Sequence, residues 1–204
     1  SGSLPVLFLP GLSDTWRFFQ PLLPYLLIST VNALAVPMRG HGSANVRPMG
    51  TDPPVSPDDI AAFLDARTLD PAVIVARSMG TTIAQRFAVE HPERVRELVL
   101  LGRGHSWRSL DGAEDLRAML QMRADPIDPG FGREFPLGPI VQPLRLRIDM
   151  VVRERLKVPA HVWQSFADDT GSHTGSISVP ILLLWGQQDA LVLRGQHDAP
   201  LDSI

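Results

Sequence analysis

Five short apolar runs constrain the fold of this chain more than any other feature. They occupy residues 5–9, 31–36, 72–75, 95–101 and 179–185. Each run is nearly continuous rather than alternating, which indicates strands buried on both faces. Helical patterns over residues 16–26, 56–66 and 79–90 separate the first four runs. This alternation predicts an α/β fold with a mostly parallel sheet and helices on both faces.

The alternation breaks over residues 106–178, where helical patterns are separated by prolines and glycines. Leu116 and Leu120 share one face of such a pattern, whereas residues 125–143 predict an irregular connection. A segment of this kind between two strands predicts an inserted helical cap. The expected organisation is therefore a core over residues 1–105, a cap over residues 106–178 and a return to the core over residues 179–204.

The composition favours a small-molecule partner. The chain has 204 residues, a formal net charge of -3 and 44% hydrophobic residues, enough for one core. Its charges are not clustered, which argues against nucleic-acid binding and a basic membrane surface. Cysteine is absent, and no histidine pair has metal-site spacing, so we expect no cofactor and no metal. Without a signal peptide or a bilayer-spanning run, a cytoplasmic location is expected. The oligomeric state stays open.

Ser78 is the candidate nucleophile. It follows an apolar run directly and precedes the helix expected at residues 79–90. A serine on a sharp strand-to-helix turn, a nucleophile elbow, needs small residues two positions before and after it, and Ala76 and Gly80 occupy those positions. The free N–H groups at a helix N-terminus favour an oxyanion, so the Met79 N–H is a candidate donor. The same short string also arises by chance, so its context decides.

Two further turns supply that context. Gly11 follows the first apolar run, where a glycine lets the backbone present the Leu12 N–H as a second oxyanion-hole donor. Asp189 follows the last apolar run through a turn, which would bring its carboxylate to the same sheet edge as Ser78. The simpler alternatives are an ordinary tight turn at Gly11 and a turn-capping role for Asp189.

Five segments together resemble consecutive landmarks of the single-domain α/β-hydrolase fold family. They are residues 5–16, Arg39-Gly40-His41-Gly42, residues 76–80, residues 91–95 and residues 179–189. The resemblance implies an eight-stranded, mostly parallel sheet, a helical cap and a Ser-acid-His triad. By that resemblance Ser78 is the nucleophile and Asp189 the acid.

The chain also departs from the family pattern. Arg77 stands where the family often has a histidine, and it can either favour an anionic substrate or pack over the cap. By comparison with the family pattern we expect this sequence to lack the family's terminal strands, and the histidine that follows the acid is not evident. His197 is a candidate base, although it lies where the family has a helix. His105 can line the pocket, and His41 is expected to be structural.

The predicted function is that of a serine hydrolase that cleaves a carboxylic ester or similar acyl bond through an acyl-enzyme on Ser78. Trp107 and Trp163 in the cap suggest a small hydrophobic substrate. Perhydrolases and carbon-carbon bond hydrolases would use the same triad and stay open. The alternative is a non-catalytic or incomplete relative that binds a ligand.

Overall fold

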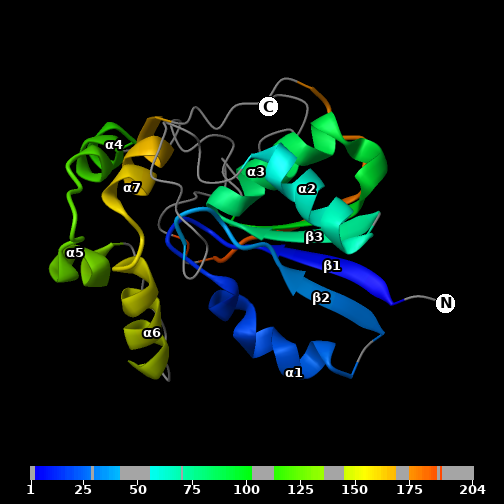
Figure 1. The fold of residues 1–204 in the computed structure, drawn as a ribbon, viewed down its shortest axis with the longest axis horizontal. Helices are drawn as coiled ribbons and strands as arrows, with labels where there is room; N and C mark the ends of the chain where they lie inside the picture. The colour runs from blue at the N-terminus through cyan, green and yellow to red at the C-terminus, as the bar shows by residue number, and fades with distance from the viewer. Residues whose placement is uncertain are drawn as a thin grey trace.

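The structure is a computed structural model whose central feature is a five-stranded parallel sheet with helices on both faces (Figure 1). The residues that it describes are 3–28, 30–41, 56–69, 71–102, 113–135, 145–168, 175–187 and 189. None of the helices in these ranges is both long and apolar enough to cross a membrane.

All neighbouring strands of the sheet run parallel, which confirms the prediction from the apolar runs. The strands are β1 (Leu4–Leu9), β2 (Val31–Ala35), β3 (Ala72–Arg77), β4 (Val95–Leu101) and β5 (Ile181–Leu184). Their spatial order is β2-β1-β3-β4-β5. The chain therefore moves outward in one direction from β1 and in the other from β3. The crevice at the carboxyl ends of β1 and β3 is the switch point where α/β sheets bind ligands.

The sheet separates two apolar cores. Successive residues of β1 point to opposite faces, so Leu7 belongs to the larger cluster and Phe8 to the smaller one. Two-sided burial holds for β1 and β3 but not for β5, the last strand of the sheet among the described residues. There Leu182 and Leu184 are exposed, and the expectation of a strand buried on both faces was wrong.

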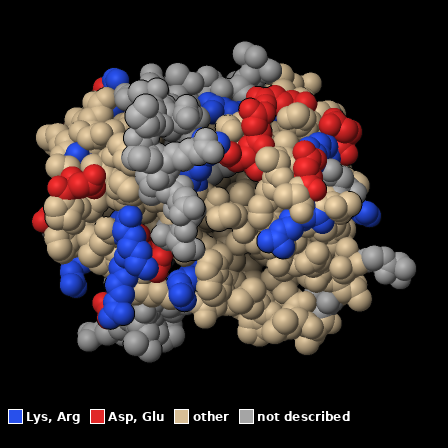
Figure 2. Space-filling model, viewed as in Figure 1, with Lys and Arg blue, Asp and Glu red and all other residues tan. Residues whose placement is uncertain are grey.

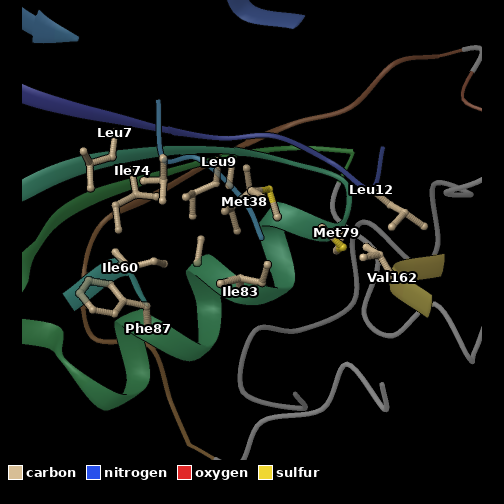
Figure 3. Packing of buried hydrophobic residues seen from close by; sticks show 14 of the residues in the cluster. Leu7, Leu9, Leu12, Met38, Ile60, Ile74, Met79, Ile83, Phe87 and Val162 are labelled. Carbon is tan, nitrogen blue, oxygen red and sulfur yellow. The ribbon is translucent and has the colours of Figure 1, made fainter. Parts of the chain in front are cut away.

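Helices α2 (Pro57–Arg67) and α3 (Met79–Glu90) cover the face with the larger core (Figures 1 and 3). A capping box between Ser56 and Asp59 begins α2. Phe87 of α3 is fully buried in this core. Because α3 starts directly after Ser78, its packing fixes the direction in which the chain leaves β3.

The other face carries a 3₁₀ helix, η1 (Trp16–Leu22), followed by the short helix α1 (Leu23–Leu26). One continuous helix was expected here, but Pro21 and Pro24 lack the N–H that an α-helical ladder requires. Much of the outer surface is apolar, with Tyr25 exposed. In Figure 2 the region over α1 shows no Lys, Arg, Asp or Glu side chains.

Four helices stand together on the side of the sheet opposite the N-terminus, beyond the carboxyl ends of the strands (Figure 1). They are α4 (Ala113–Gln121), α5 (Pro129–Glu134), α6 (Arg145–Arg155) and α7 (Ala160–Asp168). Helix α5 was not expected, because residues 125–143 were predicted to be irregular. The Asp128 carboxylate accepts a hydrogen bond from the Phe131 N–H at 2.8 Å and thereby starts this helix.

Helix α7 packs directly against the core domain. A Cβ atom on Gly40 would lie 2.5 Å from Cγ2 of Val162, so only glycine permits this approach. Gly40 also has a positive φ of 72°, which favours glycine. Gly40, in the glycine-rich turn after β2, thus allows α7 of the α4–α7 group to pack against that turn.

Candidate active site

Ser78 occupies a strained turn between β3 and α3. Its backbone has φ 50° and ψ -124°, a conformation that non-glycine residues rarely adopt. The Ser78 N–H donates to the carbonyl oxygen of Leu101 at 3.1 Å, and the Ser78 carbonyl accepts from the Thr81 N–H at 2.8 Å. These bonds hold the turn, and the serine is exposed at its apex. Strain that the surrounding structure maintains in this way is common at active sites.

Different steric constraints require the small residues at positions 76 and 80, on either side of Ser78. Ala76 lies in the central strand and is fully buried. A Cβ on Gly80 would lie 2.6 Å from the carbonyl oxygen of Leu9 and 2.7 Å from that of Pro10. Glycine at this position therefore lets α3 approach the end of β1 more closely than any other residue would.

The chain leaving β1 forms a tight turn against Ser78. The Asp14 N–H donates to the carbonyl oxygen of Gly11 at 3.0 Å and closes the turn. A Cβ on Gly11 would lie 3.1 Å from the Cβ of Ser78, so the two turns are in contact. Ser13 has a positive φ of 65°, which costs a non-glycine residue about 1–2 kcal/mol. We call residues 11–14 the oxyanion turn, after the role that is proposed for them below.

The N–H groups of Leu12 and Met79 flank this contact from the two turns. Within the part of the chain that the structure describes, neither N–H has a hydrogen-bond acceptor. The side chains of both residues are buried, and Figure 3 shows them pointing toward Val162 of α7. Apolar packing therefore anchors two residues whose backbone donors are free to bind an anion.

Arg77 is paired with Asp14 of the oxyanion turn. The guanidinium Nη1 donates to Oδ2 of Asp14, and its carbon Cζ lies 4.3 Å from the ring centroid of Phe18. The carboxylate of Asp14 is almost fully buried. Burial lowers the pKa of Arg155 in α6, and the Asp14 carboxylate opposes that shift. The sequence analysis missed this pairing, whose one local signal is the acid at the last position of the turn.

His41 holds the oxyanion turn from the opposite side. Its Nδ1 lies 2.9 Å from the carbonyl oxygen of Arg39, so this nitrogen carries a proton and donates. Its Nε2 accepts a hydrogen bond from the Ser13 N–H, also at 2.9 Å. Desolvation by burial lowers the pKa of His41, outweighing the opposing effects of the Arg39 carbonyl and the Asp14 carboxylate. Both nitrogens of the neutral ring are therefore used by the backbone.

Asp189 lies at the same sheet edge as Ser78. The Gly102 N–H at the end of β4 donates to the carbonyl oxygen of Leu184 at the end of β5, at 2.9 Å. Oδ2 of Asp189 lies 3.4 Å from where a Cβ on Gly102 would stand. Since Leu101 accepts from Ser78, one ladder joins the ends of β3, β4 and β5. The backbones after β3 and β5 are two strand spacings apart, about 10 Å.

The described histidines offer no evident partner for Ser78. His41 is occupied by backbone groups, and His91 stands at the far end of α3, about 18 Å along the helix. His161 is exposed on α7. The candidate base His197 and the pocket candidate His105 lie outside the described residues.

The interior of the helical group differs from the expectation for Trp163. This side chain is fully buried between Phe131 and Phe135, and its Nε1 donates to the carbonyl oxygen of Val158 at 3.2 Å. With no exposed surface, it packs the helices together and does not face solvent. Trp107 lies outside the described residues.

A cavity of about 400 Å³ adjoins the oxyanion turn, with Pro10, Asp14, Trp16 and His41 in its wall. Ser78 is not one of its lining residues, so this cavity borders the turn without containing the exposed serine.

Comparison with known proteins identifies the family. A family model described as "alpha/beta hydrolase fold" matches residues 5–153. The chain therefore belongs to the α/β-hydrolase fold family.

Individual relatives match with moderate identity. The dihydrolipoyllysine-residue acetyltransferase component of the acetoin cleaving system of Cupriavidus necator is 35% identical over 103 residues, 49% of this chain and 26% of that protein. The 2-hydroxy-6-oxononadienedioate/2-hydroxy-6-oxononatrienedioate hydrolase of Cupriavidus pinatubonensis is 25% identical over 198 residues, 90% of this chain and 68% of that protein. The chain thus spans between about a quarter and about two thirds of these curated relatives.

A solved esterase from Rhodococcus sp. ECU1013 has a similar fold. It superposes with a TM-score of 0.80 at 21% identity, and the match covers 96% of this chain and 76% of that one. The similarity supports the α/β-hydrolase architecture at the level of the backbone.

We predict that Gly80→Ala destabilises the chain. An alanine inside a helix would by itself add about 1 kcal/mol of stability relative to glycine. Because the new Cβ meets two backbone carbonyls that cannot move independently, we expect a net loss of about 1–3 kcal/mol. Chemical denaturation measures the difference.

Gly186→Ala is the matched control, because nothing lies within 4 Å of a Cβ at that position. Its free energy of unfolding should stay within about 0.5 kcal/mol of the parent. Equal stability of the two variants would show that the approach of α3 to β1 is not as tight as described.

Proposed function

We propose that this chain is a serine hydrolase that cleaves a carboxylic ester or similar acyl bond of a small hydrophobic substrate. The observation that carries the proposal is the position of Ser78, exposed on a strained elbow at the switch point of the sheet. The N–H groups of Leu12 and Met79, which have no acceptor among the described residues, flank it. An exposed hydroxyl beside two free backbone donors is what acyl transfer requires.

The reaction proceeds in two steps. Ser78 Oγ attacks the substrate carbonyl, and the proton of the hydroxyl passes to a histidine base. The developing oxyanion accepts hydrogen bonds from Leu12 and Met79, the alcohol leaves with the proton, and an ester forms on Ser78. Water then attacks this acyl-enzyme by the same route and releases the acid.

The position of Asp189 supports its role as the acid that orients the base. The gap of about 10 Å between the backbones after β3 and β5 leaves room for an imidazole between Ser78 Oγ and the carboxylate. A histidine there would use one ring nitrogen for each partner. His197 is the candidate that this sequence offers.

We further propose that α4–α7 form a cap that bounds the substrate site. These helices lie beyond the carboxyl ends of the strands (Figure 1), and Val162 belongs to the same apolar cluster as Leu12 and Met79 and lies near them in Figure 3. The relatives include a hydrolase of 2-hydroxy-6-oxononadienedioate and a solved esterase. Both names agree with hydrolysis at a carbonyl. We favour an ester because its cleavage requires the fewest catalytic groups beyond the nucleophile, the oxyanion donors, the base and the acid.

Ser78→Ala tests the nucleophile. Without the hydroxyl no acyl-enzyme forms, so kcat for a p-nitrophenyl ester should fall by about 10⁴-fold or more. A fluorophosphonate probe should label the parent chain and not this variant, as read by mass spectrometry of the intact protein. Ser3→Ala, at an exposed position near the N-terminus, is the control and should behave as the parent. Turnover that survives Ser78→Ala would refute the proposal.

Asp189→Asn tests the acid. An amide cannot stabilise the imidazolium or hold the productive tautomer, so kcat should fall by about 10⁴-fold while KM changes little. Asp65→Asn on α2 removes a carboxylate whose side chain is 70% exposed and should leave kcat unchanged. Parental kcat in the Asp189 variant would assign the acid to another residue.

A further inference from the structure

We propose that His41 is a positioning residue, which fixes the oxyanion turn so that the Leu12 N–H faces the reacting carbonyl. The inference rests on the proposed function, since it assigns a purpose to the turn only if Ser78 is acylated. His41 lies in the glycine-rich turn after β2. It makes no hydrogen bond to Ser78 in the described structure and, by this proposal, does not touch the substrate. It acts through the backbone of Ser13.

The hydrogen bonds of His41 define one ring tautomer. The Arg39 carbonyl can only accept, so Nδ1 carries the proton and Nε2 is left as an acceptor. That acceptor receives the Ser13 N–H in a bond that is buried on both sides. Since burial also lowers the pKa of His41, the ring keeps the neutral state that this bond needs.

The bond acts at the point where the turn is strained. Ser13 stands at the third position of the turn with a positive φ, where a serine prefers other conformations. The Ser13 N–H belongs to the peptide unit that follows Leu12. Holding this unit in place stops it from flipping and so limits the rotation open to Leu12, whose own N–H is the proposed donor.

The remaining contacts of the turn leave this task to His41. The Asp14–Arg77 ion pair holds the end of the turn, and the packing of Leu12 against the core holds its side chain. Neither contact sets the orientation of the peptide between Leu12 and Ser13, and the bond from the Asp14 N–H to the Gly11 carbonyl is compatible with either orientation of that peptide. Within the described residues, the Ser13 N–H has His41 as its hydrogen-bond acceptor.

Two substitutions separate the hydrogen bond from the bulk of the ring. The side-chain amide of His41→Asn reaches the position of Nδ1 and can still donate to Arg39, but it leaves the Ser13 N–H without an acceptor. The side-chain oxygen of His41→Gln reaches the position of Nε2 and can still accept from Ser13. His91→Gln, at the far end of α3, controls for loss of a histidine elsewhere.

The experiment measures kcat and KM for a p-nitrophenyl ester, together with hydrogen exchange of the Ser13 amide by NMR. For His41→Asn we expect kcat to fall by about 10- to 100-fold with little change in KM, because a misplaced donor weakens binding of the transition state alone. Its Ser13 amide should exchange faster than in the parent. His41→Gln should restore most of kcat and the slow exchange, and His91→Gln should match the parent in both.

Four results would overturn the inference. Parental kcat in His41→Asn would show that the bond does not serve catalysis, and unchanged Ser13 exchange would show that the bond does not form. Equal losses of kcat and of melting temperature in both His41 variants would mark a general structural role. If the parent chain itself shows no Ser78-dependent turnover, the proposed function fails and this inference falls with it.

Discussion

The close approach of Gly80 to the carbonyls of Leu9 and Pro10 is the contact on which the rest of the site depends. It seats the first turn of α3 against the end of β1, and that places the strained backbone of Ser78 beside the oxyanion turn. The parallel register of β1 and β3 then keeps the two turns level, since Leu9 pairs with Ala76. Any side chain at position 80 would separate these elements, and the Leu12 and Met79 donors would move apart with them.

Around this contact, apolar side chains fix the residues of the site and polar groups hold the turn. Leu12, Met79 and Val162 bury their side chains together, which fixes these residues, while the N–H groups of Leu12 and Met79 have no acceptor in the part of the chain that the structure describes. Polar groups hold the turn itself, with His41 at its centre and the Asp14–Arg77 pair at its end. The Asp14 carboxylate of this pair is almost fully buried, so removing the Arg77 guanidinium would leave an uncompensated buried charge. This arrangement suits a site whose backbone N–H donors must be held in position and yet remain available to bind a ligand.

The sequence predicted the sheet well because each buried strand carries its own apolar run. The turns at Ser78 and Gly11 were predictable because their small residues stand at fixed offsets from the strand ends. The sequence also contains the prolines that shorten η1 and α1 and the Asp128 cap that starts α5. Their effect on the helices depends on tertiary neighbours, which local patterns do not reveal. The Asp14–Arg77 pair joins residues 63 positions apart, and the burial of Trp163 depends on two phenylalanines, one within α5 and one directly after it. Such long-range contacts need the fold before they can be recognised.

The central claim is that Ser78 and the two backbone donors form one acyl-transfer site. A crystal structure of the chain after reaction with a fluorophosphonate tests it most directly, because the phosphonate mimics the tetrahedral intermediate. We predict a phosphorus bonded to Ser78 Oγ and a phosphonyl oxygen about 2.7–3.1 Å from the N–H nitrogens of both Leu12 and Met79. A phosphonate on another residue, or one on Ser78 whose oxygen points away from both donors, would contradict the account.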